Sequence, residues 1–141
     1  MTTKVLVDTG PLVALIDRRD HFHSWAKAEA ENFDYPLYTC ESVLSEACFL
    51  LQHIPGGSQA VMSFVQEDLL RIDLSLQDEA ASLKKLLMRY ADVPMAMADA
   101  CMVRLSELNE KSVLWTVDSD FRIYRRNGRS TIPILLPAER Y

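Results

Sequence analysis

The stretch KVLVDTGPLVALI, residues 4–16, decides the fold class of this chain. A short apolar run ends in Asp8, a turn follows at Gly10 and Pro11, and a second apolar run begins directly afterwards. This order is typical of a strand, a tight turn and a helix with proline in its first turn. It places Asp8 at the carboxyl end of a strand, which is where open α/β sheets collect ligands and catalytic groups.

Strand and helix patterns alternate along the rest of the chain. Short β-rich runs predict further strands at 36–39, 70–74, 112–117 and 132–135. Helical patterns lie between them, at about 21–33, 40–53, 58–69, 77–90 and 95–109, and a short helix starts at 119. We expect Thr39 to cap the helix at 40–53, and Ser75 with Asp78 to cap the helix at 77–90. The alternation implies an α/β protein with a mostly parallel sheet between helical layers.

Length and composition indicate a single domain, residues 1–141. The chain is 49% hydrophobic and 25% charged, which suits a soluble globule with a buried core. No apolar run approaches the roughly 20 residues of a membrane helix, and the start lacks a signal-peptide pattern, so we expect a cytoplasmic protein without membrane contact. The three cysteines lack zinc-site spacing and are expected to be reduced core residues.

The formal net charge of −5 argues against a general nucleic-acid coat protein, because such binding depends on neutralising phosphates. It does not exclude an enzyme that holds phosphates through metal ions.

Four carboxylates are candidates for chemistry. Asp8 and Asp118 each follow a predicted strand, while Glu46 and Asp99 lie on apolar faces of predicted helices. If both strands are central and parallel, all four side chains converge at one edge of the sheet. Because clustered carboxylates repel one another, such a cluster requires protons, cationic partners or metal. No lysine stands at a fixed spacing from the four, so Mg²⁺ or Mn²⁺ is the natural occupant.

Each acid also has a structural explanation when it is taken alone. Asp8 and Asp118 are suited to cap the helices that follow them, and Glu46 resembles an ordinary helix-edge residue. Asp99, among methionines and alanines, is harder to explain in this way. The four acids together, in the order that a parallel sheet juxtaposes, favour a metal site that lowers the pKa of bound water and stabilises charge on a phosphoryl centre.

These residues carry a resemblance to a known family. The segments VLVDTGPL (5–12), SVLSEA (42–47), ADACMV (98–103) and TVDSDF (116–121) resemble, in order, the acidic motifs of PIN-domain ribonucleases, especially the VapC-type toxins and their stand-alone relatives. The resemblance implies a three-layer α/β/α fold with a central, mostly parallel five-stranded sheet. It also implies a Mg²⁺- or Mn²⁺-dependent endoribonuclease that hydrolyses RNA, forms homodimers and, as the toxin of a VapBC-type pair, binds an antitoxin protein.

The resemblance assigns roles to the four acids. Asp8, Asp99 and Asp118 match the main metal ligands of the family. Glu46 matches an acid that binds metal directly or through water and helps to orient the nucleophile.

Four further positions match or depart from the family. Thr9 and Thr116 match hydroxyl positions beside the acids, where they would hold water or a carboxylate. Asp120 matches an auxiliary acid, although capping the last helix explains it equally well. Relatives whose helix starts with the same Pro-Met pair often carry another aspartate where this chain has Ala96, and the missing acid would weaken metal binding or abolish activity.

A cluster of arginines follows the fourth motif. Arg122, Arg125 and Arg126, with Arg129 beyond them, give local positive charge to an acidic protein. Such a cluster guides an RNA backbone toward a metal site, or it is simply the solvated face of a helix and turn.

Three other functions compete with a nuclease. The triplet Asp8-Thr9-Gly10 also marks aspartic proteases, but those enzymes are almost wholly β and this chain is rich in helical patterns. A phosphatase with an aspartyl nucleophile would need a second aspartate or lysine pattern that is not found. A catalytically silent PIN module that binds RNA or protein is the main alternative, and Ala96 is the feature that favours it.

Overall fold

A computed structural model describes residues 2–138. Five strands form one sheet in the order β3-β2-β1-β4-β7, and every pair of neighbours is parallel. The strands are β1 (Lys4–Val7), β2 (Leu37–Thr39), β3 (Leu70–Ile72), β4 (Ser112–Trp115) and β7 (Ile134–Leu135). The predicted parallel five-stranded sheet is therefore confirmed.

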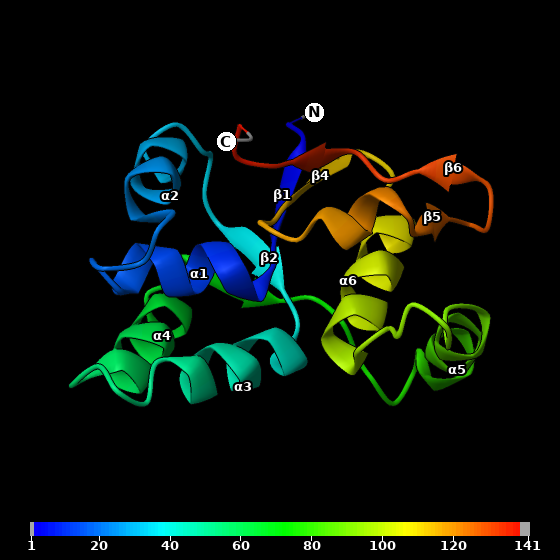
Figure 1. Ribbon diagram of the computed structural model, residues 1–141, viewed down its shortest axis with the longest axis horizontal. Helices are drawn as coiled ribbons and strands as arrows, with labels where there is room; N and C mark the ends of the chain where they lie inside the picture. The colour runs from blue at the N-terminus through cyan, green and yellow to red at the C-terminus, as the bar shows by residue number, and fades with distance from the viewer. Residues whose placement is uncertain (1, 139–141) are drawn as a thin grey trace.

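Helices cover both faces of the sheet. They are α1 (Thr9–Ile16), α2 (His23–Ala30), α3 (Glu41–Leu50), α4 (Gly57–Gln66), α5 (Ala80–Arg89) and α6 (Met97–Leu108). In Figure 1, α1, α2 and α4 lie on one side of β1, and α5 and α6 lie on the other, while α3 contacts both α1 and α6. This arrangement confirms the α/β/α layers. Within residues 2–138, every helix is too short or too polar to cross a membrane.

The core lies on both sides of β1 and β4. Leu6, Val7 and Leu114 are completely buried, as expected for central strands covered by helices on both faces. Trp115, also completely buried, packs its ring against Trp25 at 5.9 Å and Phe33 at 4.8 Å between centroids. These contacts attach the end of β4 to α2 and to the segment that follows it. The three cysteines are free thiols.

Two expected helix caps differ from the structure. Thr39 does not cap α3, because it is the last residue of β2 and its hydroxyl donates to the Val7 carbonyl at 2.9 Å. Cys40 takes the N-cap position instead, without a side-chain hydrogen bond. The Ser75 hydroxyl does accept the Asp78 N–H at 3.2 Å, but this contact closes a turn and α5 begins only at Ala80.

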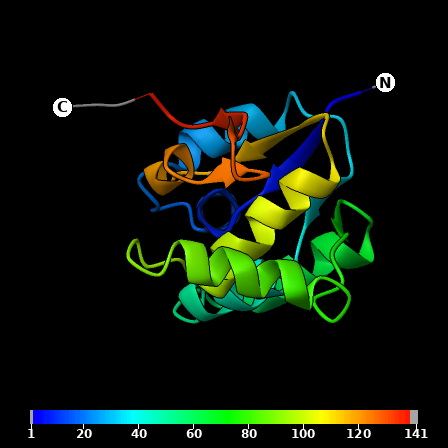
Figure 2. The same cartoon turned by 90° about the vertical axis from the view of Figure 1, so that its right-hand side faces the viewer.

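A short hairpin was not expected from the sequence. It follows the 3₁₀-helix η1 (Ser119–Arg122) and pairs β5 (Arg125–Arg126) antiparallel with β6 (Ser130–Thr131). Asn127 and Gly128 turn the chain with positive φ values of 54° and 72°, which is the Asn-Gly preference of tight hairpins. Figure 2 shows α6 crossing in front of the sheet, with α5 packed below it and the hairpin above.

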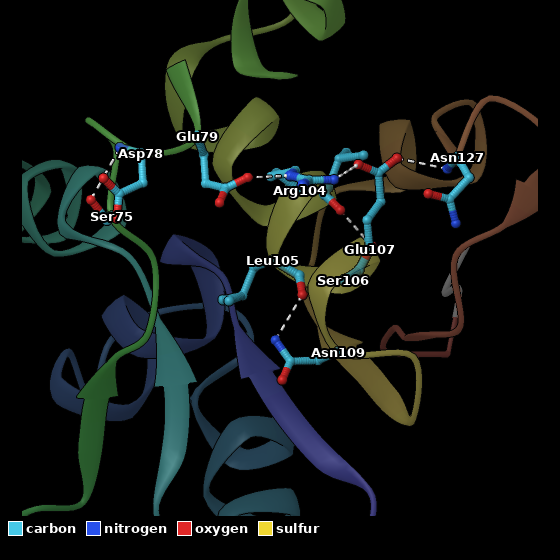
Figure 3. Close-up of polar contacts among 10 residues, drawn as sticks. Ser75, Asp78, Glu79, Arg104, Leu105, Ser106, Glu107, Asn109 and Asn127 are labelled. Atoms are coloured by element: carbon cyan, nitrogen blue, oxygen red, sulfur yellow. Dashed lines mark hydrogen bonds and ion pairs between the residues drawn. The ribbon is translucent and has the colours of Figure 1, made fainter. Parts of the chain in front are cut away.

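Arg104 connects α6 to both neighbouring segments (Figure 3). Its guanidinium donates to Glu79 at 2.6 Å, at the entry of α5, and to Glu107 at 3.2 Å. Glu107 in turn accepts the backbone N–H of Asn127 in the hairpin at 2.6 Å. The side chain of Glu107 is only 9% exposed, so its charge depends on these donors.

Replacing Arg104 with methionine is expected to lower the free energy of unfolding by about 1–3 kcal/mol, because it leaves two poorly solvated carboxylates without their cation. Chemical denaturation measures this change. The matched variant Arg71→Met removes an exposed ion pair with Asp68 and is expected to have no measurable effect. Equal stability of the Arg104 variant and the parent protein would contradict a stabilising role for the network.

Candidate active site

Asp8 stands directly after β1, at the carboxyl edge of the sheet. Its backbone N–H still bonds to the Trp115 carbonyl at 3.0 Å, and its position is the N-cap of α1. The carboxylate does not cap that helix. Instead, Oδ2 accepts a hydrogen bond from the Thr116 hydroxyl at 2.7 Å. The capping explanation therefore does not account for Asp8.

The environment of Asp8 disfavours its negative charge. The side chain is buried, and this burial is the main reason that its pKa is raised to about 6. The nearby charges of Asp99 and Asp118 raise the pKa further, while the hydrogen bonds from Thr116 and the Thr9 backbone oppose the rise. A carboxylate in this position is stabilised by any cation that binds beside it.

Asp99 lies in the first turn of α6. One of its oxygens, Oδ2, accepts the backbone N–H of Ala96 at 3.0 Å, which satisfies a free donor at the helix start. Its pKa is raised by partial burial first, and then by the charges of Asp118, Glu46 and Asp120. The charge of Glu46 thus reaches the site, although its side chain on α3 is exposed.

Asp118 occupies the N-cap of η1. Its Oδ1 accepts the backbone N–H of Asp120 at 2.9 Å, so the capping role that the sequence allowed is present here. The backbone N–H of Asp118 donates to the Thr116 hydroxyl at 3.0 Å. Thr116 therefore joins the two acids, because it donates to Asp8 and accepts from the segment that carries Asp118.

At the carboxyl edge of the sheet, the charge of Asp118 acts on both Asp8 and Asp99, and that of Glu46 acts on Asp99. Within residues 2–138, no three acidic, histidine or cysteine side chains are close enough together to form a metal site. Their chemistry nevertheless suits a hard divalent cation, since all four are oxygen donors and their charges raise the pKa of Asp8 and Asp99. The buried Thr9 hydroxyl, directly after Asp8, also has no hydrogen-bond partner among the described residues.

Tyr124 is a residue of the site that the sequence did not reveal. It is completely buried, and its hydroxyl has no hydrogen-bond partner in the described part of the chain. Burial and the charges of Asp99, Asp120 and Asp118 raise the pKa of this phenol above its usual range. In the sequence, an aromatic residue after a short helix indicates only core packing, so no signal distinguished it.

The three arginines that the sequence suggested for RNA binding do not lie in one place. Arg125 directs its guanidinium at the backbone carbonyls of 122–124, with the shortest contact, 2.6 Å, to Arg122. Arg126 reaches the Glu110 carbonyl and the Ser112 hydroxyl, at the amino end of β4. Arg122 is exposed on η1, two residues after Asp120. Of the three, Arg126 therefore lies at the opposite end of β4 from Asp118.

The raised pKa of Asp8 predicts an unusual effect of pH on stability. Above about pH 6 the buried carboxylate is ionised and destabilises the metal-free fold, whereas below about pH 4 it is protonated in both the folded and unfolded states. Asp8→Asn is therefore expected to raise the free energy of unfolding in EDTA at pH 7, by up to about 3 kcal/mol, and this gain should vanish near pH 4.

Urea denaturation between pH 4 and 8 measures this difference. The control Asp68→Asn should change the free energy of unfolding little at any pH, because its carboxylate and its ion pair with Arg71 are exposed to solvent. A gain from Asp8→Asn that does not depend on pH would contradict the assignment of a raised pKa to Asp8.

Comparisons with known proteins agree with this architecture. The family model described as PIN domain matches residues 5–127. The crystal structure of Mycobacterium tuberculosis VapC20, described as a Sarcin-Ricin loop cleaving toxin, superposes with a TM-score of 0.75 at 20% identity and covers 83% of this chain and 92% of that chain. That likeness concerns the fold, and no curated protein matches the sequence. Because the family model spans most of its length, the chain belongs to the PIN-domain family.

Proposed function

We propose that this protein is a metal-dependent endoribonuclease that hydrolyses RNA phosphodiester bonds. The observation that carries the proposal is the group of Asp8, Asp99 and Asp118, whose charges act on one another at the carboxyl edge of the sheet in a PIN-domain chain. Perturbed carboxylates that converge from separate elements mark a functional site more often than a structural one.

Asp8, Asp99 and Asp118 would hold Mg²⁺ or Mn²⁺, with Glu46 at the exposed side of the site. When bound, the cation would supply charge stabilisation at the phosphoryl centre and lower the pKa of water. The protein orients each of the three ligands by a hydrogen bond. Thr116 holds Asp8, the Ala96 N–H holds Asp99, and the Asp120 N–H holds Asp118. Fixed ligands of this kind reduce the cost of organising the site when a cation binds.

RNA is the substrate that this arrangement favours. Because the chain carries a net charge of −5, it would bind a polyanion such as RNA only at a part of its surface where positive side chains or metal ions are concentrated. Arg122 and Arg125 supply positive charge beside η1, the segment that Asp118 caps, and we assign them to the RNA backbone. Arg126 would contribute to the same polyanion farther along the hairpin, and Asp120 and Thr9 would act as auxiliary groups.

A VapBC-type toxin is the biological role that this proposal implies. VapC20 is described as a toxin that cleaves the Sarcin-Ricin loop, and it shares the fold of this chain. By analogy, we propose a cytoplasmic single-domain protein that forms homodimers and is inhibited by an antitoxin protein.

A catalytically silent PIN module that binds RNA or protein is the alternative. Ala96 favours it, because this residue at the start of α6 has no side-chain oxygen to offer the site. The two functions differ in one observable property, which is cleavage that depends on a divalent cation.

Purified protein free of antitoxin is expected to cleave members of a structured RNA panel in Mn²⁺ or Mg²⁺ and to be inactive in EDTA. Asp8→Asn and Asp99→Asn should each reduce cleavage below detection, because each removes a ligand charge while the fold is retained. Gel-based cleavage assays measure this loss, and circular dichroism verifies folding.

Asp68→Asn is the matched control. It neutralises an exposed aspartate at the opposite edge of the sheet, and asparagine tolerates the positive φ of 61° at this position. Cleavage should be unchanged in this variant. Folded parent protein that cleaves no RNA under any metal condition would instead favour the silent module.

A further inference from the structure

Tyr124 is held rigidly beside the acids. Its ring makes edge-on contacts with Phe121, at 5.3 Å between centroids, and with Tyr90, at 5.0 Å. The residue is completely buried, two positions after η1. Since packing encloses the ring on two sides, the location of its hydroxyl is set by the core rather than by a polar partner.

Within residues 2–138, the hydroxyl of Tyr124 lacks the hydrogen-bond partner that a buried polar group needs. It is buried and lacks a hydrogen-bond partner among the described residues, a state that is unfavourable and uncommon in folded proteins. The neighbouring Tyr90 shows the usual condition, because its hydroxyl accepts the backbone N–H of Arg125 at 2.9 Å. The unpaired Tyr124 hydroxyl therefore needs a hydrogen-bond acceptor, and we expect it to gain one when a ligand binds at the acid site.

Among the charged groups around the Tyr124 hydroxyl, the Asp99 carboxylate has the largest effect on its pKa. Asp99 acts on the phenol more strongly than Asp120 or Asp118 does, and a weak side-chain interaction with Asp99 adds to its charge effect, although the two groups do not meet the geometry of a full hydrogen bond. A protonated phenol can donate, and a carboxylate can only accept. One oxygen of Asp99 is already held by the Ala96 N–H. The phenol and the carboxylate are therefore complementary as donor and acceptor.

We propose that Tyr124 is a positioning residue of the acid site, whose buried hydroxyl donates to the Asp99 carboxylate and fixes it for binding a divalent cation. This inference rests on the proposed metal-dependent function. It explains why a polar group is retained at the centre of an aromatic cluster. With Ala96 on one side and Tyr124 on the other, Asp99 is oriented by a backbone donor and by a side-chain donor.

The test is Mn²⁺ binding to the full-length chain, measured by isothermal titration calorimetry. Tyr124→Phe removes only the hydroxyl and is expected to weaken Mn²⁺ binding by about tenfold, the loss typical of groups that orient a metal ligand. In EDTA its unfolding temperature should be unchanged or higher, since an unpaired buried hydroxyl is removed. Weaker metal binding without lost stability is not expected of a residue that only packs.

Tyr90→Phe is the matched control from the same cluster. It removes a hydroxyl that bonds to Arg125 and is expected to lower the unfolding temperature while leaving Mn²⁺ affinity unchanged. If Tyr124→Phe binds Mn²⁺ as tightly as the parent, or loses affinity only together with stability as the control does, this inference is overturned and the nuclease proposal stands. If the parent protein binds no Mn²⁺, both are overturned.

Discussion

The parallel pairing of β1 with β4 is the constraint on which the site depends. The register sets Val7 opposite Trp115, and the Asp8 N–H continues the ladder to the Trp115 carbonyl. Asp8 and Thr116 thereby become neighbours, although 108 positions separate them in sequence, and the Thr116 hydroxyl bonds to the Asp8 carboxylate. A slip of one residue would turn each side chain of the strand to the other face and break this contact.

The same constraint creates an electrostatic cost. Bringing the ends of β1 and β4 together with the start of α6 gathers Asp8, Asp118 and Asp99 where burial and mutual repulsion raise the pKa of Asp8 and Asp99. Hydrogen bonds from Thr116 and from backbone N–H groups offset part of that cost. The fold therefore carries a local instability at the point where a cation would be most favourable, which is how functional sites commonly differ from the rest of a core.

The sequence predicted the elements whose signals are local. The apolar run before Asp8, the alternation of strands with helices and the order of the four acids were sufficient for the parallel sheet. Sequence patterns were misleading where a side chain forms its hydrogen bond with a residue far away in the sequence. Thr39 looks like a helix cap, but the adjacent β1 offers the Val7 carbonyl to its hydroxyl.

The candidate site shows the same division. The positions of Asp8 and Asp118 after their strands could be predicted from hydrophobic patterns, whereas the Thr116 bridge depends on strand register. The buried place of Tyr124 depends on how its ring packs against Phe121 and Tyr90, and no spacing in the sequence encodes that packing. The Asn127-Gly128 turn was the one local signal for the hairpin.

The most direct test of the central claim is a crystal structure of the protein grown with Mn²⁺, with the metal located by its anomalous scattering. The account predicts a peak at the carboxyl edge of β1 and β4, with carboxylate oxygens of Asp8, Asp99 and Asp118 as ligands. Absence of Mn²⁺ from this edge at saturating concentration, or a peak bound only by residues elsewhere, would contradict it.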